Sequence, residues 1–429
     1  MNKYIRQSVI PLIIGTAFLR IGASSVTVML ALLLAHLSNH AGHAITSIEV
    51  GLLAVAFYIT ELVLAPLMGA LSDQWGRKRF LVLGPALGFI EVTLLPFTPN
   101  TSPLLYLLIL QVIAGLSSAI FVPATLSYLA DFTAQNRGRR MRVMSFYELA
   151  TSGGLAIGVV LGGFAWERLG RYAFLLVGVF YLVVLVSMLL TPDVRQLIEH
   201  ASLRRKLQRY GRLLRVPRLV AFVPAWLCVC ALLGVWLTSL LPFLLSMPHH
   251  DTHQLLIGSM TGHGSRLSLV LGGLVLVFGL SLLFWAFFLN RIKRLTLMLM
   301  AVLGIFLVCI ALTGINHRGE GNNILILAWL PLLLAGIFAI SGFAPAALAY
   351  LADISEESAK DRGMLMGLYS IFLGLGQLLG NGMGGVFAHQ WGFDGLIYFS
   401  LLLGCIAFLS IGWLVWQEKK LSLRNRYAA

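Results

Sequence analysis

The sequence predicts an all-α integral membrane protein with twelve transmembrane helices. These form two six-helix halves related by a pseudo-two-fold axis along the membrane normal. Hydrophobic residues make up 59% of the 429 residues and charged residues 11%, whereas soluble domains are roughly half apolar and a quarter charged. Apolar runs recur along the whole chain, and a segment of the first half is repeated in the second. Lipid is therefore the expected solvent for most of this surface.

Twelve apolar runs are long enough to cross a bilayer. A hydrocarbon core of ~30 Å needs about 20 helical residues, and in lipid the backbone must satisfy its own hydrogen bonds. The first run is too long for a signal peptide and lacks a cleavage site of small residues, so we interpret it as a span. The predicted spans are 9–36, 50–70, 80–97, 104–130, 142–164, 172–190, 218–246, 267–289, 295–314, 323–352, 363–388 and 394–416.

The basic residues lie mostly on one side of this predicted bundle. With a cytoplasmic N-terminus, 26 of the 31 Lys and Arg residues fall on the cytoplasmic side. Positive charge is enriched in cytoplasmic loops, so we expect a multi-pass protein of the cell (inner) membrane with both termini in the cytoplasm. Because the net charge of +14 is spread over short loops, we expect no nucleic acid as a partner.

A basic segment at 191–217 separates two predicted domains, a six-helix half at 1–190 and a second six-helix half at 218–429. Leucines alternate with its charges, which fits an amphipathic helix lying on anionic lipid. A solvated linker kept in the cytoplasm by its charge fits equally well. The basic residues are Arg195, Arg204, Arg205, Lys206, Arg209, Arg212 and Arg215.

The repeat pairs segments that are 222 residues apart. Residues 121–131 read FVPATLSYLAD, and residues 343–353 read FAPAALAYLAD. Two halves with an even number of spans share one topology, and such parallel repeats are related by an axis along the membrane normal. Internal duplication also occurs in channels, so the repeat alone does not establish transport. The same offset pairs Gly154, Gly158, Gly162 and Gly163 with Gly376, Gly380, Gly384 and Gly385.

The loop after the second span, residues 69–79, reads GALSDQWGRKR. It resembles the signature loop of the major facilitator superfamily, G-x-x-x-D-x-x-G-R-R/K, and with the twelve spans and the repeat the resemblance covers essentially the whole chain. The resemblance implies a secondary transporter that works by alternating access. It also implies a cytoplasmic gate in which Arg77 bridges two acids and one acid faces the start of the eleventh helix. The gate residues are Gly69, Asp73, Gly76, Arg77 and Asp131.

The gate residues also have separate physical roles. Gly69 permits a close approach of the second helix to a neighbour, Gly76 permits a tight turn, and Asp73 is placed to face a helix N-terminus. Alternatively, the basic residues at 77–79 only set the topology. The matching loop of the second half, NRIKR at 290–294, lacks the acid and the glycine, so we expect a weaker latch there.

The glycines of the fifth span resemble the G-x-x-x-G-P-x-x-G-G motif of drug–proton antiporters. Val159 stands in place of the proline, and Gln111 stands where the R-x-x-x-G pattern of that branch has arginine. The resemblance implies proton-coupled export, while the two departures leave the branch open. The same glycine spacing also fits ordinary packing of helices through small residues.

Four ionisable residues lie inside predicted spans: Arg20, Glu61, Glu91 and Glu148. Such residues are costly in lipid and are candidates for function. The first three lie roughly 15 Å from the cytoplasmic end at 1.5 Å per residue, so Arg20 and Glu61 can interact near the midplane. That pair could couple transport to protons, since burial favours the neutral acid and a nearby arginine favours the carboxylate. It could equally be a static ion pair. For Glu91, in a peripheral helix, we expect a quiet pairing with a neighbour.

The second half has no charge at comparable depth, and its polar candidates are Gln377 and Asn381. Aromatic residues such as Trp226 and Trp236 could line an apolar path that suits a lipophilic solute. We therefore expect proton-coupled export of a small lipophilic or cationic compound. The alternatives are uptake of an organic, possibly anionic solute bound by Arg20, and a non-transporting membrane sensor or scaffold on the same fold.

Other classes of function lack support in the sequence. The four cysteines lie inside apolar runs without metal-site spacing, and no arrangement of a nucleophile with a base is evident. We expect no enzyme activity, no metal and no cofactor. The expected partners are a small-molecule substrate, protons and the lipid bilayer, and we expect a monomer.

Overall fold

The structure is a computed structural model. It describes residues 3–40, 44–132, 137–192, 217–248, 253–288, 292–319, 324–356 and 362–428. Within these ranges the chain forms helices and short turns, without strands. The side chains of Asp73, Asp131 and Glu148 are outside the described part, as is almost all of the linker predicted at 191–217.

The helices follow the predicted spans. The first half contains α1 (Lys3–His40), α2 (Ser47–Trp75), α3 (Arg77–Leu94), α4 (Pro103–Phe132), α5 (Arg137–Leu169) and α6 (Ala173–Leu190). Short 3-10 turns follow α3 and α5, at η1 (Leu95–Phe97) and η2 (Gly170–Tyr172). The second half contains α8 (Pro217–Trp236), α9 (Leu240–Leu245), α10 (Gly264–Phe288), α11 (Arg294–Asn316), α12 (Ile324–Ser341), α13 (Phe343–Glu356) and α14 (Arg362–Ala428).

The predicted number of spans agrees with these helices. In the described part of the chain, ten helical stretches are long and apolar enough to cross a membrane. The stretch Leu149–Leu190 contains two helices joined at η2, and Ile371–Lys419 contains two helices joined at Gly392, where φ is 60°. Each of these two stretches therefore holds two predicted spans, and the all-α membrane fold with twelve spans is confirmed.

Two predicted spans are interrupted in the structure. The span at 218–246 consists of α8, a bend at 237–239 and the short α9, and the span at 323–352 is divided at Gly342 into α12 and α13. At the repeat offset, Ile120 of the first half corresponds to Gly342, and α4 continues through it. Glycine costs roughly 1 kcal/mol relative to alanine inside a helix. The break therefore occurs where the two repeats differ by a glycine.

Contacts divide the chain into two compact units. The first comprises Met1–Glu199, Thr238–His249 and Gly258–Gly273, and the second comprises His200–Leu237, His250–Ile257 and Leu274–Ala429. The segment containing α9 thus belongs to the first unit, where the Ser239 hydroxyl donates to the Thr27 carbonyl oxygen at 2.9 Å. The division of the sequence at 191–217 stays a prediction.

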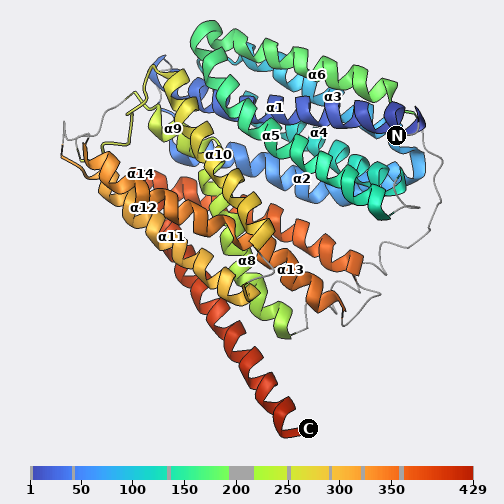
Figure 1. Ribbon diagram of the computed structural model, residues 1–429. Helices are drawn as coiled ribbons and strands as arrows, with labels where there is room; N and C mark the ends of the chain where they lie inside the picture. Colours follow the sequence, from blue (N-terminus) through green and yellow to red (C-terminus); the bar gives the residue numbers. More distant parts are fainter. Residues whose placement is uncertain are drawn as a thin grey trace. The chain divides into compact units, whose positions relative to one another are not determined.

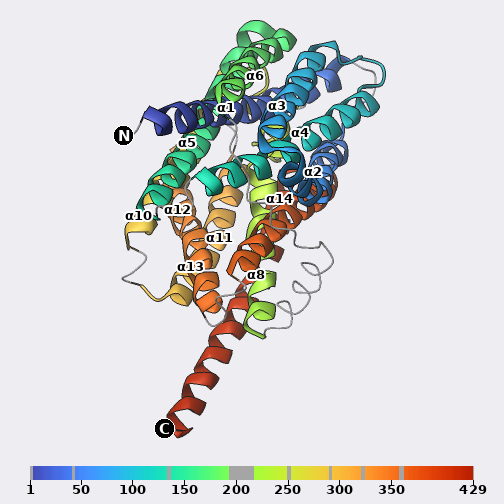
Figure 2. The ribbon, with the colours of Figure 1, turned by 90° about the vertical axis from the view of Figure 1, so that its right-hand side faces the viewer.

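Within the first unit, α1 packs against α5 and α6, and α4 packs against α2 and α3 (Figure 1 and Figure 2). Glycines bring α5 directly onto the backbone of α1. A Cβ added at Gly158 would clash with the Ile21 carbonyl oxygen. The Ser25 hydroxyl of α1 donates to the Gly158 carbonyl oxygen at 2.9 Å. The glycine motif of the fifth span therefore forms a close helix contact.

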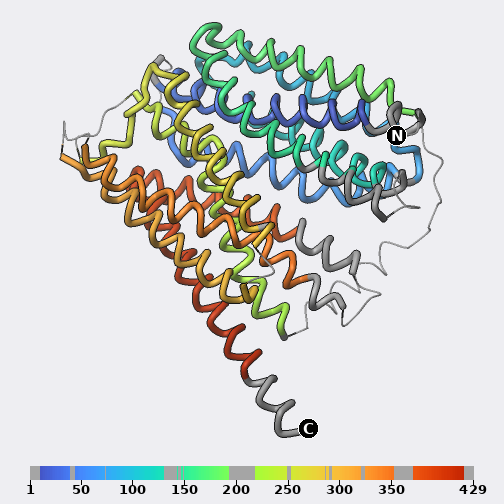
Figure 3. Tube along the Cα trace, viewed as in Figure 1, coloured from blue at the N-terminus to red at the C-terminus, as the bar shows by residue number. Residues whose placement is uncertain are grey.

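The second unit repeats this contact. Here α8 packs against α14, and α11 runs beside α12 (Figure 3). A Cβ added at Gly380 would clash with the Ala231 carbonyl oxygen. Because Gly380 is the repeat partner of Gly158, the two units use equivalent glycines in equivalent helix pairs. The sequence repeat thus corresponds to a repeated packing arrangement.

Replacing Gly158 by alanine should lower the thermal stability of the protein. The new methyl group would meet backbone, which cannot rotate away, and overpacking of this kind costs about 1–3 kcal/mol. Thermal unfolding of the detergent-purified protein measures the effect. Gly153→Ala in the same helix is the matched control, because nothing lies within 4 Å of a Cβ at that position. Equal unfolding temperatures for the two variants would contradict the tight contact.

Candidate functional site

A polar contact joins α2 to α4 inside the first unit. The Ser118 hydroxyl donates to Glu61 Oε1 at 2.6 Å. The two helices come close because Gly115, three residues before Ser118, has no side chain. A Cβ there would lie 2.5 Å from the Phe57 carbonyl oxygen. Gln111 lies on the same face of α4, since residues four and seven apart share a helix face.

Arg20 of α1 is the basic residue that the sequence pairs with Glu61. Arg20 and Tyr58 both lie within electrostatic range of Glu61. In the described structure, no nitrogen–oxygen distance of 4.0 Å or less joins Arg20 to Glu61. The guanidinium also donates no hydrogen bond to a described residue. The structure therefore shows no direct ion pair between Arg20 and Glu61, and their predicted interaction stays a prediction.

The helix contact described above also positions Arg20. A Cβ added at Gly154 would lie 2.8 Å from the Cβ of Arg20. The repeat partner of Gly154 is Gly376, and a Cβ there would clash with the Cβ of Cys230. Cys230 therefore occupies in the second unit the place that Arg20 occupies in the first. The repeated scaffold carries a charge at this place in only one of its two described copies.

The gate loop contains one glycine that its backbone requires. Gly76 joins α2 to α3 with φ 94° and ψ 126°. Residues other than glycine rarely adopt this backbone conformation. Arg77 begins α3, and its Nε and Nη1 atoms are buried. A Cβ at Gly69 would lie 3.5 Å from the Cβ of Pro123, an ordinary contact. The predicted latch between Asp73, Arg77 and Asp131 lies partly outside the described side chains and stays a prediction.

The polar candidates of the second half lie in a helix contact. Asn381 is 1% exposed and donates to the Gln377 carbonyl oxygen at 2.8 Å. Gly234 of α8 approaches this point, because a Cβ there would lie 2.5 Å from the same oxygen. The structure thus places both residues where α8 meets α14. A role for either of them toward a solute stays a prediction, as it does for Gln111 and Glu148.

Two aromatic residues of the second half, Trp226 and Trp236, make contacts within the second unit. Trp226 is 2% exposed and stacks with Phe222 and Phe343 at ring-centroid distances of 6.2 and 6.0 Å. Trp236 donates its indole N–H to the Ser400 hydroxyl at 3.0 Å. The prediction that Trp226 lines a solute path is therefore corrected, since it belongs to the core of the second unit.

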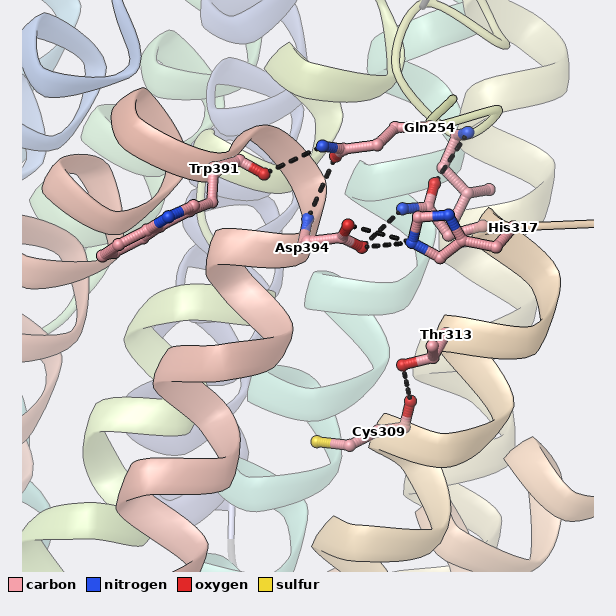
Figure 4. A network of polar contacts seen from close by, with 8 residues as sticks. Gln254, Cys309, Thr313, His317, Trp391 and Asp394 are labelled. Carbon is pink, nitrogen blue, oxygen red and sulfur yellow. Dashed lines mark hydrogen bonds and ion pairs between the residues drawn. The ribbon is translucent and has the colours of Figure 1, made fainter. Parts of the chain in front are cut away.

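A second polar cluster surrounds Asp394 in the second unit (Figure 4). Asn316 donates its Nδ2 to Asp394 Oδ1 at 2.8 Å, and His317 Nε2 lies 3.0 and 2.9 Å from the two carboxylate oxygens. The backbone N–H of Asp394 donates to Gln254 Oε1 at 3.1 Å. Gln254 in turn donates to the Trp391 carbonyl oxygen at 3.0 Å. The carboxylate of Asp394 thus joins the bend in α14 to the end of α11, and its backbone N–H joins the bend to the segment that contains Gln254.

The sequence did not predict this cluster. Asp394 follows Gly392 by two residues, between two apolar runs, and an acid next to a turn glycine was the available signal. Two features favour glycine at position 392. Its φ is 60°, and a Cβ there would lie 2.8 Å from Gln254 Oε1. The histidine and the asparagine come from a segment far away in the sequence, so spacing could not reveal the cluster.

Asp394→Ala should destabilise the protein more than His317→Ala. Removing the carboxylate takes away the acceptor of the buried Asn316 amide, and an unsatisfied buried group costs about 1–3 kcal/mol. The His317 side chain is 44% exposed, and exposed ion pairs contribute roughly 0–1 kcal/mol. Thermal unfolding of the two purified variants makes the comparison. Because both variants remove the contact between His317 and Asp394, a larger loss for His317→Ala would mean that the buried Asn316 amide does not depend on its carboxylate acceptor.

Gly76→Ala should destabilise the turn of the gate loop by about 1–3 kcal/mol, because alanine is strained at this φ and ψ. Gly69→Ala is the matched change in the same loop, since its Cβ would meet only an ordinary contact. Thermal unfolding should show a lower temperature for the first variant and a temperature near wild type for the second. The reverse order would mean that packing at Gly69 is the stricter constraint.

The known proteins that this chain resembles agree with the observed membrane fold. The model of the Major Facilitator Superfamily matches residues 12–317 and 255–428. The chain is 31% identical over 143 residues to Multidrug resistance protein 1 of Bacillus subtilis (strain 168), which covers 33% of this chain and 35% of that protein. It is 24% identical over 379 residues to Multidrug resistance protein 2 of the same organism, 86% of each. Quinolone resistance protein NorA of Staphylococcus aureus is 25% identical over 150 residues, 35% of this chain and 37% of NorA.

Solved structures show the same architecture at low identity. The nucleoside transporter NupG superposes with a TM-score of 0.71 at 14% identity, over 95% of this chain and 96% of that one. The D-xylose-proton symporter gives 0.68 at 15% identity, over 95% and 96% of the two chains. The resemblance seen in the loop at 69–79 is thereby confirmed, and a transporter rather than an enzyme is indicated. The chain belongs to the Major Facilitator Superfamily.

Proposed function

We propose that the protein is a proton-coupled exporter of a small lipophilic or cationic compound that works by alternating access. The observation that carries this proposal is Glu61, an acid in the middle of a membrane span, hydrogen-bonded to Ser118 and within range of the charge of Arg20. An acidic side chain at such depth is energetically unfavourable, and the acids retained there usually have a function. Glu61 is the proposed site of proton binding, and Arg20 is its counter-charge.

The contact with Ser118 suits a group that gains and loses a proton. A serine hydroxyl donates to the carboxylate, and it can accept from the O–H of the neutral acid. The hydrogen bond can thus persist in both states, so that the distance to Arg20 decides between them. At an effective dielectric constant of ~20, separating two opposite charges from ~6 to ~10 Å weakens their attraction by about 1 kcal/mol. A modest movement of α1 against α2 would therefore change the proton affinity severalfold.

The same carboxylate provides a basis for exchange. Either a proton or a lipophilic cation can compensate the negative charge of the Glu61 carboxylate, so binding of one disfavours binding of the other. This competition is what an antiporter requires, because it prevents both from being carried together. Export of such compounds also agrees with the names of the relatives, which are multidrug and quinolone resistance proteins. We therefore propose lipophilic cations as the first class of solute to test.

Uptake of an organic anion is the second candidate. It is favoured by one observation, that the Arg20 guanidinium makes no hydrogen bond or ion pair with any residue the structure describes. A carboxylate solute could pair with it in a bidentate manner. The names of the structural neighbours, a nucleoside transporter and a D-xylose-proton symporter, show only that other proteins of this fold carry polar organic solutes.

The membrane orientation belongs to the same proposal. The distribution of Lys and Arg supports two cytoplasmic termini in the cell membrane. On this orientation the loop at 69–79 faces the cytoplasm, and a latch of Asp73, Arg77 and Asp131 would hold that side closed. We also propose a monomer with halves at 1–190 and 218–429, joined by the basic segment 191–217.

Glu61→Gln and Arg20→Gln should each abolish transport driven by a pH gradient, lowering it by at least about tenfold. The first variant removes the proton site. The second removes the charge that allows the acid to ionise, and a loss of ~1.4 kcal/mol already changes an equilibrium tenfold. The measurement is the flux of ethidium, a lipophilic cation, into proteoliposomes with and without an imposed pH gradient. Glu49→Gln, at the start of the same helix α2, is the matched control and should transport as wild type does.

The double variant Glu61→Gln/Arg20→Gln separates coupling from packing. Removing one of the two charges leaves the other uncompensated inside the span, and removing both restores neutrality. We expect thermal stability to recover in the double variant while proton coupling stays absent. Recovery of coupling as well would reduce the pair to a structural role.

Wild-type flux of benzoate but not of ethidium would favour the uptake of anions.

A further inference from the structure

The start of α10 packs against the end of α5. The segment Gly258–Gly273, which includes the start of α10, belongs to the first unit, and the rest of α10 belongs to the second. Because α2 ends and α3 begins at the gate loop, and successive spans alternate in direction, α5 also begins on that side. The end of α5 is therefore on the opposite side, which is the external side in the proposed orientation.

Glycines let α5 and α10 approach each other through their backbones. A Cβ added at Gly163 would clash with the Gly264 carbonyl oxygen, and a Cβ added at Gly264 would lie 2.9 Å from the Gly163 carbonyl oxygen. Further along α10, a Cβ added at Gly272 would clash with the side chain of Val160. The two helices are thus in contact from the start of α10 to Gly272, with no room for a larger side chain at these glycines.

Glu167 closes the external end of this contact. Its Oε2 accepts a hydrogen bond from the backbone N–H of Ser265 at 2.7 Å. Ser265 is the second residue of α10, so its N–H is one of the four that have no partner within the helix. The helix dipole also favours a carboxylate at this end. Because Glu167 is exposed, water can replace both partners when they separate, and no buried charge is left behind.

The contact also buries a hydroxyl that has no partner. Ser268 of α10 is 0% exposed, and its Oγ makes no hydrogen bond with a residue that the structure describes. The same oxygen would clash with a Cβ at Gly163, so it faces α5. A buried polar group without a partner disfavours the state in which it occurs, and water reaches this hydroxyl once the helices separate. The packing and the Glu167 hydrogen bond thus favour the closed contact, whereas Ser268 favours its opening.

We infer that Glu167 is a gating residue of the transport cycle, which holds α5 and the start of α10 together while the external side is closed. The inference rests on the proposed alternating access, in which a path opens on each side in turn. Opening of the external side exchanges the hydrogen bond between Glu167 and Ser265 for water and exposes Ser268. The gate proposed at the loop 69–79 acts on the opposite side, so the two contacts close alternately.

Labelling of Leu32→Cys by a membrane-impermeant maleimide, added outside intact cells that produce the full chain, tests this role. Leu32 of α1 is 6% exposed and lies beside Gly264, where a Cβ would be 3.5 Å from its Cδ1. Cysteine is smaller than leucine, so it does not force the contact apart. We expect slow labelling of this variant. Adding Glu167→Ala should accelerate labelling about fivefold, the change expected for the loss of a helix cap.

Two controls accompany this comparison. Arg168→Ala removes a neighbouring exposed charge that makes no hydrogen bond with any described residue, and it should leave the labelling rate of Leu32→Cys unchanged. The unfolding temperature of the Glu167→Ala variant should stay close to that of the Arg168→Ala variant, so that faster labelling reports opening and not loss of the fold. The wild-type chain gives the background from the native cysteines.

Two further variants act on the contact without changing its charge. Gly163→Ala should accelerate labelling, because its methyl group would meet the Gly264 carbonyl oxygen only in the closed contact. Ser268→Ala should slow labelling, since it removes the unsatisfied hydroxyl from the closed contact. A general loss of stability would accelerate labelling in every variant, so the slower rate of Ser268→Ala is specific to the inferred equilibrium.

Equal labelling rates for Glu167→Ala and Arg168→Ala would overturn the inference, as would labelling of Leu32→Cys alone at the rate of the unfolded chain. If Glu167→Ala does not fold, Glu167→Gln decides in its place, because it keeps the size of the side chain and removes the charge that the start of α10 favours. Absence of pH-driven ethidium flux in the wild-type chain would contradict the proposed function, and the labelling rates would still decide on Glu167.

Discussion

The close approach of α5 to α1 is the contact on which the rest of the first unit depends. In lipid, apolar side chains gain little by leaving the solvent, so helices associate mainly through tight packing and hydrogen bonds. Gly154 and Gly158 provide both, because they admit the backbone of α1 and accept hydrogen bonds from its serines. This contact sets the position of Arg20 along the bundle. Its counterpart at Gly376 and Gly380 provides the same support in the second unit.

The two copies of the duplicated scaffold carry different side chains at this helix contact. Arg20 and Cys230 occupy equivalent places, yet one carries a permanent charge and the other a small apolar group. A cation inside a membrane span is costly without an anion nearby, and Glu61 of α2 is the proposed counter-charge of Arg20. The second unit needs no such compensation at this depth, so its polar side chains Gln377 and Asn381 can serve helix packing. The duplication thus accounts for the shared helix packing, and substitutions at single positions account for the different side-chain chemistry of the two units.

The second unit places its main polar cluster at a bend rather than in the middle of a span. Asp394 lies where α14 bends at Gly392 and is held by Asn316 and His317. At this place a carboxylate can be buried among donors from a helix end and a turn, where backbone groups need partners in any case. The cluster therefore strengthens a connection between elements, whereas Glu61 and Glu91 are acids of the membrane interior that lack such a set of donors.

The sequence by itself determined the number of spans, the repeat and the superfamily, because these depend on apolar length and on motifs that are continuous along the chain. It also identified Arg20 and Glu61, since any charge in an apolar run is conspicuous. Only the tertiary structure decided that Ser118 donates a hydrogen bond to Glu61, that the ring of Tyr181 lies between α3 and α1, and that Trp226 is buried in the core. It also revealed the partners of Asp394. These facts depend on which helix faces meet, and in spans that are apolar on every side the hydrophobic pattern does not specify the facing side.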